Sequence, residues 1–336
     1  MADGLVIGIL SIGDMGLGIA KLLQSQGYKV ATFAEDRSER TQDRARSSGI
    51  ELLPSIPALV SVCTCILSIV PPRDALETAK RVADSIPTAS ASSDTNTNTN
   101  RNTRKNPGPL YYLDLNATAP SLARELASLF TSNKDTIFID GGIIGGPPSP
   151  LNPNPQETTG IETVTNWTRP SLITSGPTLP PSLSHLTATL NIEHIGPGIG
   201  SASTVKMCFA STTKGFIALA IQAFVTADAM GVLPHLRGYM EKHNKAALAA
   251  AERGVVGMAP KAYRWVNEMQ QIGQTMEEEG GFGSGMFDGA AEVYRLVAED
   301  TALGLEQPGR RARGTTVEDV VAVMREGMKN AKEKVD

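Results

Sequence analysis

Short apolar runs recur between residues 5 and 196, and stretches with helical spacing separate them. The runs read LVIGIL, KVATF, VCTCILSIV, LYYLDL, TIFID, SLITSG and NIEHIG. Strands that alternate with helices in this way form βαβ units, which build a mostly parallel sheet covered by helices on both faces. The pattern therefore predicts a doubly wound α/β domain over residues 1–197.

The strand pattern stops after residue 200, and the rest of the chain has helical periodicity. Helices are expected near 201–230, 234–253, 260–279, 285–305 and 315–334, with breaks at Pro234, Pro260, Gly280 and Pro308. This pattern predicts an all-helical C-terminal domain over residues 198–336.

The segment 205–230 is the most apolar stretch of the chain. It contains four polar residues that a membrane-spanning helix rarely carries, namely Lys206, Lys214, Gln222 and Asp228. We interpret the segment as a buried helix and expect no contact with a membrane.

Composition and charge argue against several classes of protein. The chain has 336 residues, 41% of them hydrophobic, and a formal charge of −4 with no basic stripe, so nucleic acid is not an expected partner. No basic region followed by an apolar stretch and a cleavage site opens the sequence, so we expect a cytoplasmic protein whose cysteines are reduced thiols. The four histidines lack ligand spacing, and no metal site is predicted.

Two segments interrupt the first domain. Residues 88–106 read TASASSDTNTNTNRNTRKN, and this nearly apolar-free run cannot offset the entropy of ordering, so we expect a disordered insert. Residues 147–170 are rich in proline and are expected to form an extended loop between two strands.

The first strand continues into GILSIGDMGLG, residues 8–18, and then into a helix. A glycine-rich turn in this context is typical of the Rossmann-type dinucleotide site, where N–H groups at a helix N-terminus bind a pyrophosphate. Ser11 stands where the fingerprint has its first glycine, and we interpret Asp14 as a helix N-cap. The residues expected at the cofactor here are Ser11, Ile12, Gly13, Asp14, Met15 and Gly16.

The choice between NADP and NAD is expected at the end of the second strand, in ATFAEDRSERTQDRARSSG. Glu35 and Asp36 can accept a bond from a ribose 2′-hydroxyl, which favours NAD, whereas Arg37 and Ser38 can bind a 2′-phosphate, which favours NADP. Because the Arg-Ser pair starts the next helix, where a cluster of phosphate oxygens fits, we favour NADP and keep NAD as the alternative.

Three loops follow later strands: LSIVPPRDA at 67–75, DLNATAP at 114–120 and DGGIIGGPP at 140–148. A fourth segment, GPGIGSASTVKMCFASTTKG at 196–215, opens the first long helix. In the order and spacing of these segments the chain resembles the β-hydroxyacid dehydrogenases, the family of 3-hydroxyisobutyrate and 6-phosphogluconate dehydrogenases. It is most similar to their short branch with a compact 6-phosphogluconate dehydrogenase-like C-terminal domain. The resemblance implies that Val70 and Pro71 line the cofactor.

The resemblance also implies catalytic residues. Lys206 matches the family's catalytic lysine, and an amine beside a positive nicotinamide ring in a partly desolvated cleft has a lowered pKa and can accept a hydroxyl proton. The alternative for Lys206 is a solvent-facing lysine of an amphipathic helix. Asn116 matches the residue that orients the reacting oxygen in relatives, with a structural turn residue as its alternative.

Two expected substrate residues depart from the family pattern. Ile144 stands where hydroxyisobutyrate-type relatives carry a serine, and Ala210 stands where relatives keep an asparagine. Apolar side chains thus replace two polar contacts, which puts a hydroxyisobutyrate-like substrate in doubt. The residues expected at the substrate are Gly141, Gly142, Ile143, Ile144, Ala210 and Thr213.

Together these features predict an NADP(H)-dependent oxidoreductase that acts on a small hydroxy acid or a related oxo compound, with Lys206 as general acid and base. An imine or carbonyl reductase of the same fold and a non-catalytic dinucleotide-binding sensor or scaffold remain as alternatives. The resemblance further implies a homodimer, because the family's helical domain binds substrate and packs against a second subunit.

Overall fold

The structure is a computed structural model that describes residues 4–87, 104–106, 108–151, 166–307 and 309–333. Most of the predicted insert 88–106 and of the proline-rich loop 147–170 therefore lies outside the described residues. The chain divides into two compact units, Met1–Lys206 and Met207–Asp336, and each is described by itself.

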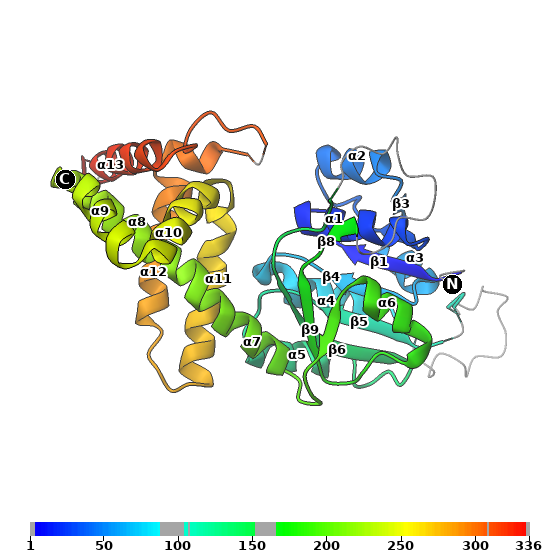
Figure 1. Cartoon of the computed structure of the whole chain (residues 1–336). Coiled ribbons are helices and arrows are strands. Elements are labelled where there is room, and N and C mark those ends of the chain that lie inside the picture. Colours follow the sequence, from blue (N-terminus) through cyan, green and yellow to red (C-terminus); the bar gives the residue numbers. More distant parts are fainter. Residues whose placement is uncertain (1–3, 88–103, 107, 152–165, 308, 334–336) are drawn as a thin grey trace, which may run out of the picture. The chain divides into compact units, whose positions relative to one another are not determined.

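The first unit is built on an eight-stranded sheet (Figure 1). Its strands are β1 (Val6–Leu10), β2 (Lys29–Thr32), β3 (Glu51–Leu52), β4 (Cys65–Ser68), β5 (Leu110–Asp114), β6 (Thr136–Ile144), β9 (Ser171–Ser175) and β10 (Ile192–His194). They lie in the order β10-β9-β6-β5-β4-β1-β2-β3, and every neighbouring pair is parallel except β6 with β9. The predicted doubly wound, mostly parallel sheet is confirmed.

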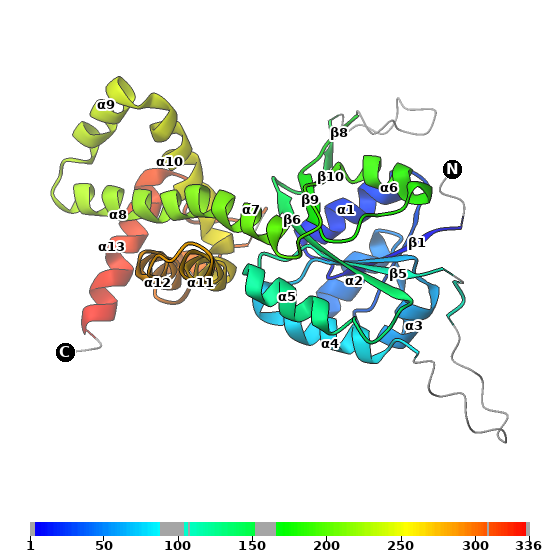
Figure 2. The same cartoon turned by 90° about the horizontal axis from the view of Figure 1, so that it is seen from below.

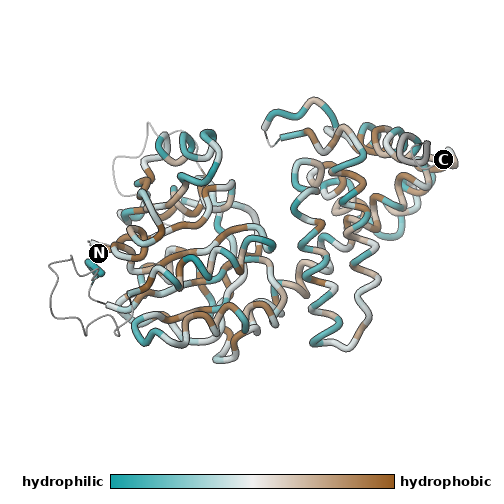
Figure 3. Tube along the Cα trace, turned by 180° about the vertical axis from the view of Figure 1, so that it is seen from behind, coloured by the Kyte–Doolittle hydropathy of each residue, from teal (hydrophilic) through white to brown (hydrophobic). Residues whose placement is uncertain are grey.

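Helices cover both faces of this sheet (Figure 2). One face packs against α1 (Asp14–Ser25), α2 (Glu39–Ser47) and α6 (Ser184–Thr189), and the other against α3 (Ile56–Val62), α4 (Ala75–Asp84) and α5 (Pro120–Ser128). Apolar residues, brown in Figure 3, gather along the strands between the helices. Strands buried on both faces read as continuous apolar runs, which is why the sequence pattern found most of them.

Two cysteines, one in β4 and one just before it, belong to this core. Cys63 and Cys65 are fully buried free thiols, while Cys208 is exposed. Burial raises the pKa of the Cys63 thiol to about 12 and that of the Cys65 thiol still further. Both thiols are therefore inert packing groups at neutral pH.

Short elements complete the first unit. Strands β7 (Ser149–Pro150) and β8 (Trp167–Thr168) form an antiparallel pair at the two described ends of the proline-rich loop. Single 3₁₀ turns occupy Pro72–Asp74 and Pro181–Leu183 here, and Ala259–Lys261 and Ala302–Leu305 in the second unit.

The described part of the second unit is helical. Its elements are the C-terminal half of α7 (Ser201–Ala210), a π-helical turn (Ser211–Gly215), α8 (Phe216–Ala229), α9 (Leu233–His243), α10 (Lys245–Met258), α11 (Ala262–Glu278), α12 (Gly285–Glu299) and α13 (Val317–Glu333). The single helix expected near 234–253 is wrong, because Asn244 ends α9 and caps α10 by accepting a bond from the Ala247 N–H. Asparagine is a preferred N-cap, since its side-chain oxygen satisfies an unpaired N–H group.

Among the described residues, one helix, Ser201–Ala229, has the length and the apolar composition needed to cross a membrane. A third of its most apolar 18-residue segment is buried. The prediction of a buried helix holds for one side only. Ile221 and Phe224 are 1% and 0% exposed, whereas Leu219 is 60% and Phe209 44% exposed.

The division between the units falls later than the predicted boundary at residue 197, since residues 198–206 group with the first unit. The reason is a set of hydrogen bonds from Gly200, Ala202 and Ser203 to the buried carboxylate of Asp140 on β6. The start of α7 is thereby fastened to the sheet.

Candidate functional site

The glycine turn between β1 and α1 has two glycines with opposite surroundings. Gly13 precedes the helix with φ −75° and ψ −170°, and a Cβ built on it meets no atom within 4 Å. A Cβ on Gly16 would overlap the carbonyl oxygen of Ser11 and lie 3.3 Å from Cγ2 of Ile9. Gly13 thus faces open space at the N-terminus of α1, while Gly16 allows the helix to contact the turn closely.

The other residues of the turn are held by the first unit. Ile12 is buried, and its carbonyl accepts a bond from Nη1 of Arg44 at 3.3 Å. The same Arg44 atom lies 3.4 Å from the Asp14 carboxylate. The interpretation of Asp14 as N-cap is wrong: Gly13 holds that position, and Asp14 is the first helical residue, where its negative charge suits the helix dipole. Ser11 and Met15 are half-buried.

The residues after β2 surround a small pocket. Ser38 holds the N-cap position of α2, and its Oγ lies 3.1 Å from Oγ1 of Thr41. Nε of Arg37 lies 3.5 Å from one Asp36 oxygen, and Nη1 of Arg81 lies 2.7 Å from the other. The pocket is lined by Leu10, Ser11, Phe33, Asp36, Arg37, Ile56, Val70, Thr78 and Arg81. Sequence reasoning missed Arg81, because only the folded sheet brings α4 beside the end of β2.

Asn116 is 2% exposed, and bonds within the protein engage both ends of its amide. Its Oδ1 accepts a bond from the Val70 N–H at 2.7 Å, and its Nδ2 donates to Ser68 Oγ at 3.0 Å and to the Asp114 carboxyl group. These bonds connect the end of β5 to the loop after β4, which contains Pro71. In this arrangement Asn116 fixes the backbone of Val70.

Two buried carboxyl groups lie side by side on neighbouring strands, since Asp114 of β5 is in register with Asp140 of β6. Burial and the neighbouring Asp140 raise the pKa of Asp114 to about 8, although Asn116 acts in the opposite direction. Asp114 is therefore mainly protonated at neutral pH.

Asp140 accepts many more hydrogen bonds than Asp114. Its two oxygens accept bonds from the hydroxyls of Ser175 and Ser203 at 2.7 and 2.6 Å, and from three N–H groups of the first turn of α7 and the residue before it. These bonds fasten the start of α7 to β6.

Residues 141–144 were expected in a loop after the sixth strand, and this expectation is wrong. They continue β6, because Asp140–Ile144 pairs with Ser171–Ser175 of β9 in antiparallel register. The chain leaves the strand only at Gly145, whose φ of +123° suits glycine.

Lys206 lies against this part of β6. Its Nζ donates to the Ile143 carbonyl at 2.5 Å, and a Cβ on Gly142 would be 2.8 Å from the Lys206 Cβ. Gly142 is therefore the contact point that lets α7 approach the strand. The structure thus brings Lys206 together with Gly142 and Ile143.

The remaining predicted substrate residues belong to the second unit. Ala210 is buried, and the Thr213 hydroxyl donates to the carbonyls of Phe209 and Ala210 at 3.2 Å each. Lys214 pairs with the carboxylate of Glu268 and lies 5.1 Å from the centre of the Trp265 ring.

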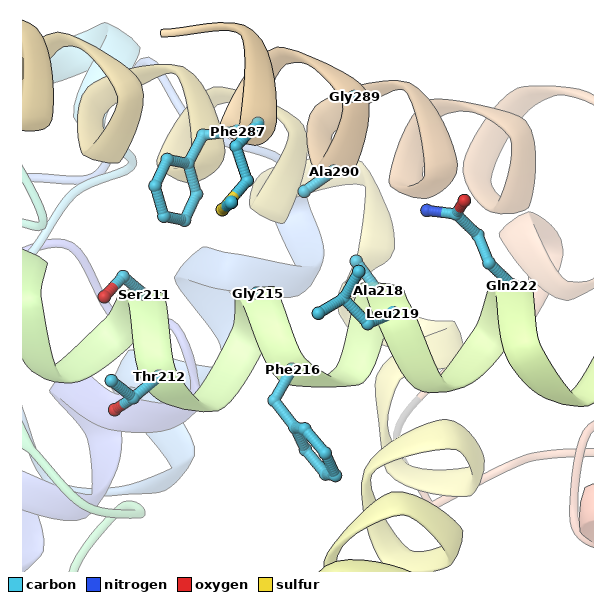
Figure 4. A pocket seen from close by; sticks show the side chains of 11 residues that line it. Ser211, Thr212, Gly215, Phe216, Ala218, Leu219, Gln222, Phe287, Gly289 and Ala290 are labelled. Atoms are coloured by element: carbon cyan, nitrogen blue, oxygen red, sulfur yellow. The ribbon is translucent and has the colours of Figure 1, made fainter. Parts of the chain in front are cut away.

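The second unit also contains a largely apolar cavity of about 250 Å³ between the π-helical turn with α8 on one side and α12 on the other (Figure 4). Phe287 and Ala290 of α12 line it opposite Gly215, Leu219 and Gln222.

Comparison with known proteins agrees with this geometry. Residues 6–152 match the model of the NAD binding domain of 6-phosphogluconate dehydrogenase, and residues 227–297 match a domain of unknown function, DUF1932. The structure of 3-hydroxyisobutyrate dehydrogenase from Salmonella typhimurium is 15% identical, with a TM-score of 0.57 over 96% of this chain and 99% of that one. Residues 6–152 are thus similar to the NAD binding domain of 6-phosphogluconate dehydrogenase, and the solved structure shares the fold of this chain.

Two further proteins are similar to this chain. An uncharacterized 28.5 kDa protein of Methanothermus fervidus is 23% identical over 268 residues, which cover 78% of this chain and 89% of the relative. A reductive aminase from Aspergillus terreus, solved with NADPH and ethyl levulinate, is 17% identical, with a TM-score of 0.50 over 96% of this chain and 99% of that one. The chain thus has a dinucleotide-binding dehydrogenase/reductase fold.

Proposed function

We propose that the protein is an NADP(H)-dependent oxidoreductase that transfers hydride between the nicotinamide and a small hydroxy acid or a related oxo compound. The observation that carries the proposal is the position of Lys206, whose amine bonds the Ile143 carbonyl on β6, a strand of the same sheet that carries the glycine turn. A lysine held at the carboxyl end of a parallel strand lies where ligands of this fold class bind.

The first unit fits the cofactor at two places. The open space at Gly13 has room for a pyrophosphate beside the first N–H groups of α1, with Ser11 and Ile12 on one side and Met15 and Gly16 in the helix. The adenosine ribose would bind over the shallow pocket at Arg37, and Ser38 follows Arg37 in the chain. When bound, the nicotinamide supplies the hydride acceptor or donor.

Lys206 then acts as general base in alcohol oxidation and as general acid in the reverse direction. In oxidation its neutral amine accepts the hydroxyl proton as the substrate carbon releases hydride; in reduction its ammonium group returns that proton to the forming alkoxide. Asn116 supports the site by holding the Val70 N–H and the loop up to Pro71.

The substrate wall is expected at Ile144, which lies on the same face of β6 as Gly142, where a hydroxyisobutyrate-binding site has a hydrogen-bond donor. The Ile143 side chain packs in the core on the opposite face and contributes its carbonyl alone. An apolar wall favours a substrate with an apolar group next to the reacting carbon. The same wall favours a second candidate, reduction of an imine or ketone, and the reductive aminase of like fold is an example of that chemistry.

The test is a screen of NADPH and NADH consumption with the purified full chain across 2- and 3-oxo acids, semialdehydes and cyclic imines. Lys206→Met should lower turnover of the best substrate by at least 100-fold, which corresponds to one general acid–base residue. Lys245→Met removes a lysine that is 77% exposed and should leave turnover unchanged. Turnover that survives Lys206→Met would refute the catalytic role, and absence of dinucleotide binding would refute the function itself.

We also propose a homodimer. The exposed apolar side chains of Val205, Phe209 and Leu219 on the helix Ser201–Ala229 support it, because such side chains are unfavourable in water and favourable in an interface. Light scattering tests the mass, and Leu219→Glu should shift the protein towards monomer.

A further inference from the structure

Two arginines and one carboxylate share the rim of the pocket at the end of β2. Arg37 follows β2 in the chain, Arg81 comes from α4, and Asp36 contacts both through different oxygens, at 3.5 and 2.7 Å. The Arg81 guanidinium also lies over the Phe33 ring, 5.3 Å from its centre. Both guanidiniums and the carboxylate line one small pocket.

We propose that Asp36 competes with the 2′-phosphate of NADP for Arg81 and Arg37, and that the Asp36–Arg81 pair sets the discrimination between NADP and NAD. This inference rests on the proposed function, because it assumes that the adenosine ribose binds in this pocket. Arg81 is then the second guanidinium for the phosphate, and Asp36 is its internal counter-ion.

Charge supports the exchange. The rim carries two positive charges and one negative charge, and a phosphate monoester at neutral pH carries about −1.5 to −2. Guanidinium groups bind phosphate through paired hydrogen bonds. The two arginines can therefore neutralise the whole charge of a phosphate. The single charge of Asp36 neutralises only one arginine.

Exposure makes Asp36 displaceable. The side chains of Asp36, Arg37 and Arg81 are 37%, 38% and 38% exposed, and ion pairs at such positions hold weakly because water and salt screen them. Arg81 has a second support in the Phe33 ring, and it lies on α4 next to the fully buried Val82. Its guanidinium therefore stays at the rim when Asp36 turns away.

With NAD the same carboxylate has the opposite effect. A ribose 2′-hydroxyl donates to a carboxylate, and Asp36 remains paired with Arg81 while it accepts that bond. Asp36 thus weakens NADP binding and strengthens NAD binding. Arg81 strengthens NADP binding, because its guanidinium binds the 2′-phosphate.

The experiment measures dissociation constants of NADPH, NADH, 2′,5′-ADP and 5′-ADP with the full chain. Asp36→Asn should tighten 2′,5′-ADP about 5-fold or more and weaken NADH, and Arg81→Met should weaken 2′,5′-ADP at least 10-fold while 5′-ADP changes less than 3-fold. Arg46→Met is the matched control, since Arg46 pairs with Asp43 on α2 and is 58% exposed; it should leave all four constants within 2-fold. Thermal unfolding confirms that each variant is folded.

The outcomes separate the two proposals. If Arg81→Met changes 2′,5′-ADP binding no more than Arg46→Met does, or if Asp36→Asn weakens it, the inference is wrong while the dinucleotide site stands. If the unmodified protein binds neither NADPH nor NADH, the proposed function is wrong and the inference falls with it.

Discussion

The two glycines of the phosphate turn give the sharpest separation between folding and cofactor binding. Gly13→Val places a side chain in open space, and the backbone angles of Gly13 are extended angles that any residue adopts. The cost to stability should be about 1 kcal/mol, from the poorer N-cap. Cofactor affinity should fall at least 100-fold, or about 2.7 kcal/mol, because the side chain fills the space that the pyrophosphate needs.

Gly16→Ala should have its main effect on the stability of the fold. Its methyl group would overlap the Ser11 carbonyl, a backbone atom that cannot rotate away, and it would press on Ile9. Because the overlapped atom belongs to the backbone, overpacking here costs about 3 kcal/mol, the upper end of its usual range, and the better helix propensity of alanine returns about 1 kcal/mol. A net loss of about 2 kcal/mol lowers the Tm of a domain of this size by roughly 4–8 °C.

The assay pairs thermal unfolding without cofactor with a titration of NADPH fluorescence. Gly13→Val should unfold within about 4 °C of the unmodified protein and bind no cofactor, whereas Gly16→Ala should unfold clearly earlier. A Gly13→Val protein that binds NADPH normally, or that is less stable than Gly16→Ala, would contradict the assignment of the two roles.

Three further predictions concern the buried groups under the site. The pKa of Asp114 is about 8 in the folded state and near 4 in the unfolded chain, so between these pH values only the folded state holds the extra proton. The free energy of unfolding should therefore fall as pH rises from about 4 to 8, by roughly 1 kcal/mol per pH unit relative to Asp114→Asn, and urea unfolding at several pH values measures this. Gly142→Ala should displace Lys206, because its methyl group would be 2.8 Å from the Lys206 Cβ. The kcat for a verified substrate should fall at least 10-fold with cofactor affinity unchanged, and an unchanged kcat would contradict the importance of this contact. Asp140→Asn replaces an acceptor of several bonds and should cost about 2–4 kcal/mol in thermal unfolding, whereas a loss below 0.5 kcal/mol would show that the carboxylate does not hold α7.

The strands and helices of the first unit follow from local pattern, and this is why they could be predicted. The fourth strand is a continuous apolar run because both of its faces are buried, and the glycine turn lies between such a run and a helix. The two-residue strand β3 was missed, since Glu51 and Leu52 carry no periodicity.

The parts of the site that escaped prediction depend on tertiary contacts. The continuation of β6 through Ile144 requires pairing with β9, a strand that lies some thirty residues further on and runs the other way. Arg81 reaches Asp36 across 45 positions of sequence. Lys206 was found through family resemblance, and its acceptor on Ile143 is a backbone atom that no side-chain pattern indicates.

That last contact has a consequence for how this site can change during evolution. Lys206 is held by a main-chain carbonyl of residue 143, so a substitution at residue 144 changes the side chain on the same face of β6 as Gly142 but leaves the acceptor in place. The Asp140 carboxylate fixes the start of the lysine's helix independently of that side chain. Under the proposed function, the substrate wall can therefore change without rebuilding the proton-transfer group, and new specificities on this scaffold are best sought at residue 144.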